Sequence, residues 1–231
     1  MKKIFTLLLL LSTGLLAQGK LIAGANFSYL APIGELKNRF SPGYGTSVFF
    51  GKEVSAKWSL SGKVEYLIFD KVNEDKMNIK REYLIGTEEK SFSYPIKSLK
   101  MDLKAYGASL QADYHLLRGT WYDVKLNLGF GIYRWNFSRG NYADSLFAPD
   151  TAGVSKLQEV LQVPTLDQDD WSGTFNAGAE FGVQIIEPLW FSVSANYKNI
   201  LGELWSTLKL DFENVASMQM FDLKATIKAR F

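Results

Sequence analysis

The feature that most constrains this chain is a regular alternation of apolar and polar residues, which returns in about eight separate segments. In the segment WSGTFNAGAEFGVQI, for example, Phe175, Ala177 and Ala179 alternate with polar or small residues. Successive side chains of a β-strand point to opposite faces of a sheet. Each segment therefore predicts a strand that has one apolar face and one polar face.

The alternation predicts a chain built mainly from strands. The predicted strands cover residues 21–30, 44–51, 58–69, 105–114, 122–132, 171–185, 190–198 and 221–231. Around Met101, Leu103 and Ala105 the alternation changes phase before Tyr106. This change predicts either a β-bulge or a strand end that projects beyond the lipid of a membrane.

The connections between the predicted strands alternate between short and long. Short turns are expected near Glu53, Arg118 and Pro188. The other connections are long polar loops, at residues 32–42, 70–100, 137–170 and 200–216. Long structureless loops are uncommon inside compact soluble domains. Short turns that alternate with long loops are typical of an up-and-down barrel in an outer membrane.

The first residues, MKKIFTLLLLLSTGLLAQ, have the layout of a secretory signal peptide. Two lysines precede an apolar run over residues 4–11, and the small residue Ala17 suits cleavage. A retained anchoring helix is the alternative, but the run is shorter than the roughly 20 residues that span a bilayer. We therefore expect a signal peptide over residues 1–18 and one exported barrel domain over residues 19–231.

Composition excludes several classes of protein. The chain contains no cysteine, so it has no disulfides, no lipid-modified cysteine and no thiol chemistry. Its net charge of +2 comes from nearly balanced acidic and basic residues, which gives no sign of a nucleic-acid partner. After the leader, no segment is uniformly apolar over the length of a membrane-spanning helix. If the mature chain crosses a membrane, it does so with strands.

A soluble β-sandwich or a lipocalin-like barrel would also alternate, with its large apolar residues turned inward. Here the residues opposite the aromatics are mostly small, polar or charged, which is the apolar outside and polar inside that lipid demands. Aromatic residues also gather towards the predicted strand ends, where amphipathic rings favour a membrane interface. They are Trp58, Tyr66, Tyr114, Tyr122, Trp171, Trp190, Phe191, Tyr197 and Phe231. A membrane barrel is therefore favoured over a soluble one.

The last predicted strand, FDLKATIKARF, alternates apolar and charged residues up to Phe231. Together with the leader, the strand count and the alternating connections, this segment resembles the small outer-membrane β-barrel family, which includes the OmpA transmembrane domain, OmpX and OmpW. The resemblance implies an all-β, transmembrane, antiparallel up-and-down barrel with eight strands, short periplasmic turns and long extracellular loops. It also implies the outer membrane of a Gram-negative-type bacterium, reached after cleavage of the signal peptide.

The same resemblance implies partners and an assembly signal. In this family, a C-terminal aromatic residue preceded by alternating apolar residues is the tag read by the barrel-assembly machinery. Carried over to this chain, the assembly signal consists of Phe221, Leu223, Ile227 and Phe231. The implied partners are outer-membrane lipid and, during biogenesis, the barrel-assembly machinery.

Residues suited to catalysis are scarce. His115 is the single histidine, so a serine–histidine mechanism would have to use it, and the chain lacks the residues for a cysteine–histidine metal cluster. It is expected at a short turn, whereas outer-membrane enzymes of this architecture work at the external rim, and no serine is marked out as its nucleophile. We therefore expect a structural role for His115, with no catalytic residue and no cofactor site.

Two features of the long segment 137–170 suggest local structure. The first is an acidic run that suits a divalent cation because carboxylates are hard oxygen ligands, made up of Asp167, Asp169 and Asp170. It lacks the glycine and distant glutamate of an EF-hand loop, so a solvated loop end is favoured and no metal site is expected. The second is SKLQEVLQ, where the spacing of Leu157, Val160 and Leu161 predicts one face of a short helix.

The residues predicted to face the lumen indicate whether the barrel is an open pore or is filled by its own side chains. Charged residues of both signs are expected to point inward: Glu65, Asp113, Glu180, Asp222, Lys63, Lys125, Lys198, Lys224, Lys228 and Arg230. An eight-stranded barrel is only wide enough to be filled by its own side chains. A buried unpaired charge costs several kcal/mol, so these groups are expected to pair. The sequence therefore disfavours a wide general porin.

Three functions of different classes fit these features. The favoured one is a non-enzymatic structural or surface-interaction barrel, whose long loops bind an extracellular ligand. The alternative is an OmpW-like narrow channel for small hydrophobic molecules, which needs a continuous apolar pocket beneath the loops and an opening in the barrel wall. The third is a lipid-active enzyme, for which the sequence nominates no external catalytic residue.

Overall fold

The alternating segments close into a barrel in the computed structural model of the protein, which describes residues 19–231. The barrel strands are antiparallel neighbours in the order β1-β12-β11-β10-β7-β6-β3-β2, and β1 closes the barrel by pairing with β2. In chain order they are β1 Leu21–Pro32, β2 Gly43–Glu53, β3 Trp58–Phe69, β6 Met101–Arg118, β7 Tyr122–Arg139, β10 Leu166–Ile186, β11 Leu189–Ile200 and β12 Met218–Arg230. This confirms the predicted eight-stranded antiparallel up-and-down barrel. The predicted signal peptide over residues 1–18 lies outside the described residues.

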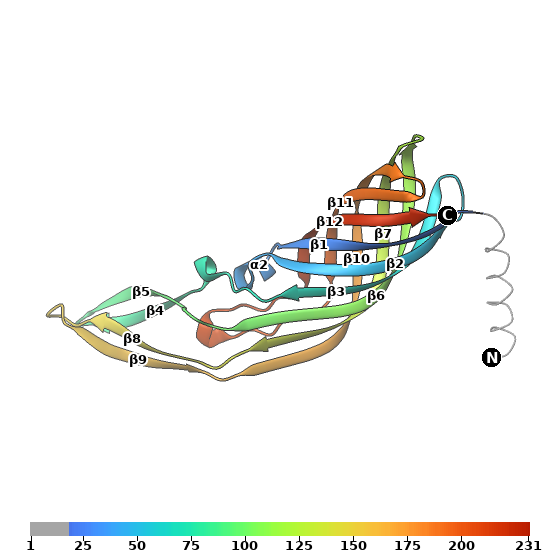
Figure 1. The fold of residues 1–231 in the computed structure, drawn as a ribbon. Helices are drawn as coiled ribbons and strands as arrows, with labels where there is room; N and C mark the ends of the chain where they lie inside the picture. The colour runs from blue at the N-terminus through green and yellow to red at the C-terminus, as the bar shows by residue number, and fades with distance from the viewer. Residues whose placement is uncertain (1–18) are drawn as a thin grey trace, which may run out of the picture.

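The barrel strands run between two ends, which we call the turn end and the loop end (Figure 1). The turn end carries the short connections 53–58, 118–122 and 186–189, as predicted. The first and last strands also meet there, because Leu21 N donates to Phe231 O at 3.0 Å and Phe231 N donates to Leu21 O at 2.9 Å. The long connections all leave from the loop end.

The long connections are folded rather than structureless. Two of them contain β-hairpins, formed by β4 Asn78–Ile85 with β5 Glu88–Pro95 and by β8 Tyr142–Pro149 with β9 Ser155–Val163. The others carry short helical turns, namely α2 Leu36–Arg39 and η2 Leu208–Leu210, and η1 Glu74–Lys76 precedes β4. Figure 1 shows both hairpins reaching away from the loop end, far from the C-terminus. Among the described residues, no helix is both long and apolar enough to cross a membrane.

The helix predicted around Leu157, Val160 and Leu161 is wrong, because these residues belong to β9. Leu146 of β8 lies opposite Glu159, whereas the next residue, Phe147, lies opposite Leu157. Gln158 is therefore the extra residue of a β-bulge, which interrupts the two-residue period. An interrupted alternation leaves apolar residues at helix-like spacing, and this explains the error.

The outer face of the barrel is apolar, as predicted for a membrane barrel. Val48, Val64, Leu110 and Ile227 are between 60% and 75% exposed, and they point away from the lumen. Soluble monomers rarely expose a contiguous apolar surface that extends around the molecule. The alternative of a soluble barrel, with its large apolar residues turned inward at every level, is not what the structure shows.

Of the two alternatives predicted near Met101, Leu103 and Ala105, the bulge is absent. β6 pairs with β3 and β7 across this region without a change of register, and its only irregularity lies between His115 and Leu117. All three residues are buried, on the same inward face as Ser109. The phase changes because the inward face becomes apolar while the outward face, with Asp102 and Lys104, becomes polar. The other alternative, a strand end beyond the lipid, agrees with these polar outward residues and stays a prediction.

Candidate functional site

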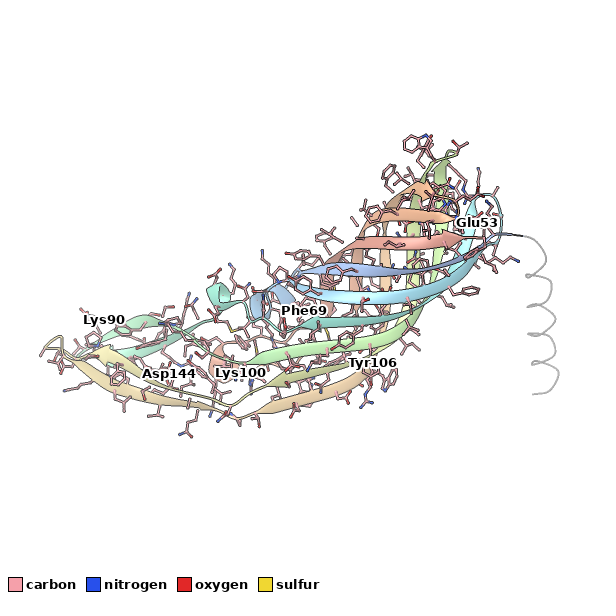
Figure 2. The ribbon with its side chains drawn as sticks, in the orientation of Figure 1. Glu53, Phe69, Lys90, Lys100, Tyr106 and Asp144 are labelled. Atoms are coloured by element: carbon pink, nitrogen blue, oxygen red, sulfur yellow. The ribbon has the colours of Figure 1, made fainter. Side chains whose placement is uncertain are left out.

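The interior of the barrel consists of two halves with opposite chemistry. Next to the turn end, inward side chains are charged or polar and bond across the lumen. Next to the loop end, inward side chains are apolar and merge with residues of the long connections into one buried cluster. Figure 2 marks both regions, with Glu53 at the turn end and Phe69 where the barrel meets the connections.

The first charged cluster is centred on Glu65 of β3. Its carboxylate accepts hydrogen bonds from Lys198 Nζ and Lys224 Nζ, each at 3.0 Å, and from the Tyr133 hydroxyl. Asp222 Oδ2 lies 3.3 Å from Lys198 Nζ and 3.1 Å from Lys224 Nζ. The cluster therefore joins β3, β7, β11 and β12 across the lumen with nearly balanced charge. It also requires Gly107, because a Cβ there would lie only 2.6 Å from the Tyr133 ring.

The second cluster, nearer the turn end, is centred on Asp123 of β7. One carboxylate oxygen lies 2.8 Å from His115 Nδ1, and the other accepts from Arg230 Nη2 and lies 3.9 Å from Lys125 Nζ. The Arg230 guanidinium also stacks on Trp190, 4.1 Å from the ring centroid. Trp190 therefore points into the barrel, which corrects its predicted place in the interfacial aromatic set.

Between the two clusters, Glu180 lies beside Lys125 and Lys228. It pairs with Lys228, and its Oε1 lies 3.6 Å from Lys125 Nζ. Lys125 Nζ also lies 3.5 Å from Asp113 Oδ2. A cavity of about 20 Å³ remains among these side chains, which is room for about one water molecule. The inward charges pair as expected except for Lys63, which has no carboxylate of residues 19–231 within ion-pair distance and donates instead to Gln111 Oε1. This half of the lumen is largely filled.

Sequence reasoning missed two members of the network, namely Asp123 and Tyr133. The signal for Asp123 was present, because it alternates in phase with Lys125, which was correctly placed in the lumen. His115 is in phase with Asp113 in the same way, but its place near the end of β6 suggested a turn. Tyr133 lies beyond the predicted strand over 122–132, which ended too early.

Ser59, His115 and Asp123 are arranged in the order of a serine–histidine–aspartate triad. Their distances and burial show whether the group has room to act on a substrate. Ser59 Oγ lies 3.4 Å from His115 Nε2, but it also donates to Asp113 Oδ2 at 3.3 Å. All three side chains are buried, and the adjoining cavity of about 20 Å³ has no room for a substrate carbonyl. The arrangement therefore fits the structural role expected for His115, as part of the hydrogen bonding that fills the lumen.

The loop half of the lumen is sealed by apolar side chains, which we call the apolar plug. Its barrel members include Leu30, Leu67, Phe69, Leu103, Trp135, Phe137, Met218 and Met220. Its members from the connections include Leu36, Phe40, Met77, Leu204, Leu210 and Val215. The chain closes tightly over Trp135, because a Cβ at Gly202 would lie 2.6 Å from the indole nitrogen. The connections thus fold onto the barrel mouth and bury it.

Arg39 of α2 fastens the connection between β11 and β12 over the apolar plug. Its Nη2 donates to Trp205 O at 2.9 Å and to Glu213 O at 2.7 Å. Its guanidinium also lies over the rings of Phe137 and Phe212, at 5.7 and 5.5 Å from their centroids. Burial, with a smaller effect of Arg139, lowers the pKa of Arg39 to about 10, so it remains charged at neutral pH.

Beyond the plug, the two hairpins pack on each other, and we call this unit the hairpin stack (β4–β5 and β8–β9). Tyr94 donates its hydroxyl hydrogen to Phe147 O at 2.8 Å, and Arg81 Nε lies 3.3 Å from Glu159 Oε2. Buried apolar side chains lie at the contact, namely Ile79, Leu146, Leu161 and Val163. Figure 2 labels Lys90 on one hairpin and Asp144 on the other, both far from Glu53.

The outer face of the β8–β9 hairpin is apolar at its centre. Phe147 lies opposite Leu157, and Val160 lies nearby opposite Ser145. The three apolar side chains are 51–54% exposed, although they lie well beyond the apolar belt of the barrel. Exposed apolar side chains grouped on a folded surface are typical of an interaction site.

The acidic run does not form a cation site. Asp169 is paired with Arg134 on the neighbouring strand, with Arg134 Nη2 2.5 Å from Asp169 Oδ2. Within residues 19–231, no group of three or more potential metal-ligating acidic or histidine side chains is assembled. Asp167 and Asp170 are exposed, as expected for solvated residues, but they lie within β10 and not at a loop end, because β10 begins at Leu166.

The four residues of the expected assembly signal lie on the outer surface of the last strand. Phe221, Leu223 and Ile227 point outward from β12 and are about half exposed or more, and Phe231 follows the strand with 68% of its surface exposed. Their arrangement along one face follows from the alternation. Their role in assembly stays a prediction.

Comparison with solved structures supports the fold. A major outer membrane protein from Thermus thermophilus aligns with 93% of this chain and 100% of its own, at 9% identity and a TM-score of 0.53. Neisserial surface protein A aligns with 91% of this chain and 97% of its own, at 12% identity and a TM-score of 0.44. Ail of Yersinia pestis aligns with 92% of this chain and 97% of its own, at 13% identity and a TM-score of 0.41. No protein-family model and no curated protein sequence matches the chain.

At such low identities, the likeness concerns the fold alone. It agrees with the closed antiparallel barrel. The chain therefore shares the barrel fold of an outer-membrane protein, as the resemblance in sequence pattern predicted.

Proposed function

We propose that the protein is an integral outer-membrane barrel that displays the hairpin stack for surface interaction and has no catalytic role. One observation carries this proposal: the charged network and the apolar plug together block the lumen, with a pocket of about 270 Å³ at the turn-end mouth, whereas the connections at the loop end build an ordered, exposed unit. A blocked lumen suits anchoring better than transport. An ordered projection with an apolar face suits a partner.

The outer surface supports membrane insertion. Outward aromatic residues line the barrel towards the loop end, where Tyr66 lies opposite Tyr106, Tyr29 opposite Tyr44, and Tyr197 opposite Phe221. Trp58 and Tyr114 lie opposite each other towards the turn end. Rows of aromatics on either side of an apolar belt are typical of outer-membrane barrels. The partner along this belt is outer-membrane lipid.

The hairpin stack is the proposed contact for an extracellular ligand. The contact surface is the apolar group formed by Phe147, Leu157 and Val160. The OmpW-like channel has less support, because the apolar residues beneath the connections pack into a plug instead of lining a continuous pocket.

Thiol labelling on intact cells tests the orientation. The chain lacks cysteine, so single-cysteine variants have no background. An impermeant maleimide should label Asn78→Cys and Ser155→Cys, which lie in the hairpin stack, but not Glu187→Cys, which lies in a turn. Equal labelling of all three variants on cells shown to be intact would contradict the proposed orientation.

The assembly signal is a further part of the proposal. Phe231 is exposed and its main chain bonds to Leu21 where β1 meets β12, so the closed barrel does not bury its ring. Phe231→Ala should greatly reduce insertion in cells when assembly capacity is limiting, yet leave refolding of the purified protein into detergent nearly intact. Normal insertion in cells would leave Phe231 only the role of an interfacial anchor.

A further inference from the structure

The outer wall of the barrel has at least two hollows, a smaller one of about 340 Å³ over β3, β6 and β7 and a larger one formed mainly by β10, β11, β12 and β1. The larger one is a groove of about 650 Å³. Its floor contains Ala179, Ala195 and Ala225, whereas larger apolar side chains border it, among them Phe27, Tyr29, Phe181 and Leu223. The groove therefore arises where three neighbouring strands place alanine on the outward face.

Strand register explains the shape of this groove. Ala179 lies directly opposite Ala195, which in turn lies opposite Leu223. One outward row closer to the turn end, Ala225 lies between Val193 and Phe27. The alanines thus form a diagonal line of small side chains that crosses two rows of larger ones. Such a line leaves a trench instead of the smooth wall made by side chains of equal size.

The chemistry of the groove selects its occupant. Its outward side chains are apolar apart from the Tyr29 hydroxyl, and the main-chain groups beneath it are paired in the barrel ladder. A polar ligand would find few hydrogen-bond partners there. An extended peptide would find no free strand edge, because the barrel is closed.

Resting on the proposed membrane function, we infer that this groove binds an acyl chain of a membrane lipid. The groove lies in the apolar belt, just to the turn-end side of Tyr197 and Phe221, where lipid chains surround the barrel. A flexible alkyl chain that lies in the trench makes close contacts on its sides as well as beneath it, and such contacts add up along its length. Neighbouring chains on the smooth wall contact the protein on one side only.

Lipid retention tests this inference with a matched pair of variants. Ala195→Phe fills the trench, whereas Ala108→Phe adds the same ring at an outward alanine of β6 that does not line it. Each protein is inserted into vesicles of phosphatidylethanolamine and phosphatidylglycerol and extracted in mild detergent. Native mass spectrometry then measures the mass of the intact protein with any phospholipid that it retains. The wild type and Ala108→Phe should retain a bound phospholipid, and Ala195→Phe should lose it.

The experiment distinguishes a failure of the proposed acyl-chain site from a failure of the proposed membrane insertion. Insertion is first measured by heat-modifiable migration of the vesicle-bound wild type, and a failure there would overturn the proposed function itself. With insertion intact, equal retention by both variants, or no retention by the wild type, would overturn only the acyl-chain site. A short bifunctional maleimide that couples two copies of Ala195→Cys would overturn it in favour of a second copy of this chain.

Discussion

The two halves of the lumen share the same strands but use opposite chemistry. On β3, Glu65 joins the charged network, whereas the next inward residues, Leu67 and Phe69, join the apolar plug. On β12, the change occurs between Asp222 and Met220. The outer wall is apolar along the middle of the barrel, but towards the loop end its longest strands carry outward charges, namely Lys104, Arg134 and Asp169. The inner wall changes in the opposite sense. It meets other charged strands at the turn end and folded connections at the loop end.

Alternation therefore identifies a strand along its whole length, but the face that is apolar can change along the strand. In the turn half, inward residues are polar and outward residues are apolar. In the loop half of β6 and β7, inward residues are apolar and outward residues such as Lys104 and Arg134 are polar, so the period of two persists with its faces exchanged. The two halves should therefore respond differently to substitution.

The largest effect is expected in the turn half. Glu65→Ala removes the carboxylate that pairs Lys198 and Lys224, and it leaves both ammonium groups with only Asp222. Leaving buried charges without a partner should lower the free energy of unfolding by about 3–5 kcal/mol. Urea titration in detergent or bilayers measures this value. A loss below about 1 kcal/mol would mean that water reaches these charges and that the network is not sealed.

The neighbouring position in the loop half should respond through packing instead. Leu67→Ala should cost about 2–5 kcal/mol, because a cavity replaces buried apolar contacts in the plug. Leu67→Met is the control, since it nearly conserves volume and should cost less than about 1.5 kcal/mol. The same urea titration compares the two variants. If both variants lose the same small amount of unfolding free energy, the side chains at the loop end of the lumen are loosely packed and do not form the apolar plug.

The outer wall should respond to charge wherever it faces lipid. Ala179→Arg places a cation in the apolar belt and should cost about 2–4 kcal/mol. Gln184 lies on the inward face and lines a turn-end pocket of about 270 Å³ with Glu187 and the Glu53–Arg118 pair, so the cost of Gln184→Arg should depend on charge pairing there and should be smaller. Folding titrations in bilayers compare the pair. A harmless Ala179→Arg beside a disruptive Gln184→Arg would return support to a soluble barrel.

The smallest effect is expected in the hairpin stack and depends on pH. Burial, together with Tyr94 and Glu159, raises the pKa of Tyr83 from about 10 to about 12. The folded stack therefore favours the neutral phenol, and this contribution is complete below pH 10 and is lost as pH rises through about 12. Hydrogen exchange in β4 should quicken over that interval in the wild type. Hydrogen exchange in β4 of Tyr83→Phe should depend less on pH over the same interval. If the two proteins respond identically, groups other than Tyr83 cause the change.

Sequence reasoning found the barrel because its strands alternate, and it placed Glu65, Lys198, Lys224 and Asp222 correctly in the lumen. It missed the hairpins because β4 and β5 are short and largely exposed, so burial imposes little pattern on them. It missed the plug because its members come from strands and connections distant in sequence. The Glu65–Tyr133 contact likewise depends on barrel closure, which no local spacing encodes.

Conductance across a planar bilayer tests the central claim, a lumen sealed by charge pairing in one half and by the apolar plug in the other. Wild-type protein, shown to be inserted, should give no stable conductance steps, because about 20 Å³ of space remains within the charged network. The variant Arg39→Ala, which releases the connection between β11 and β12, should stay closed while the charged network is intact. Stable, ohmic opening of the wild type would contradict the account.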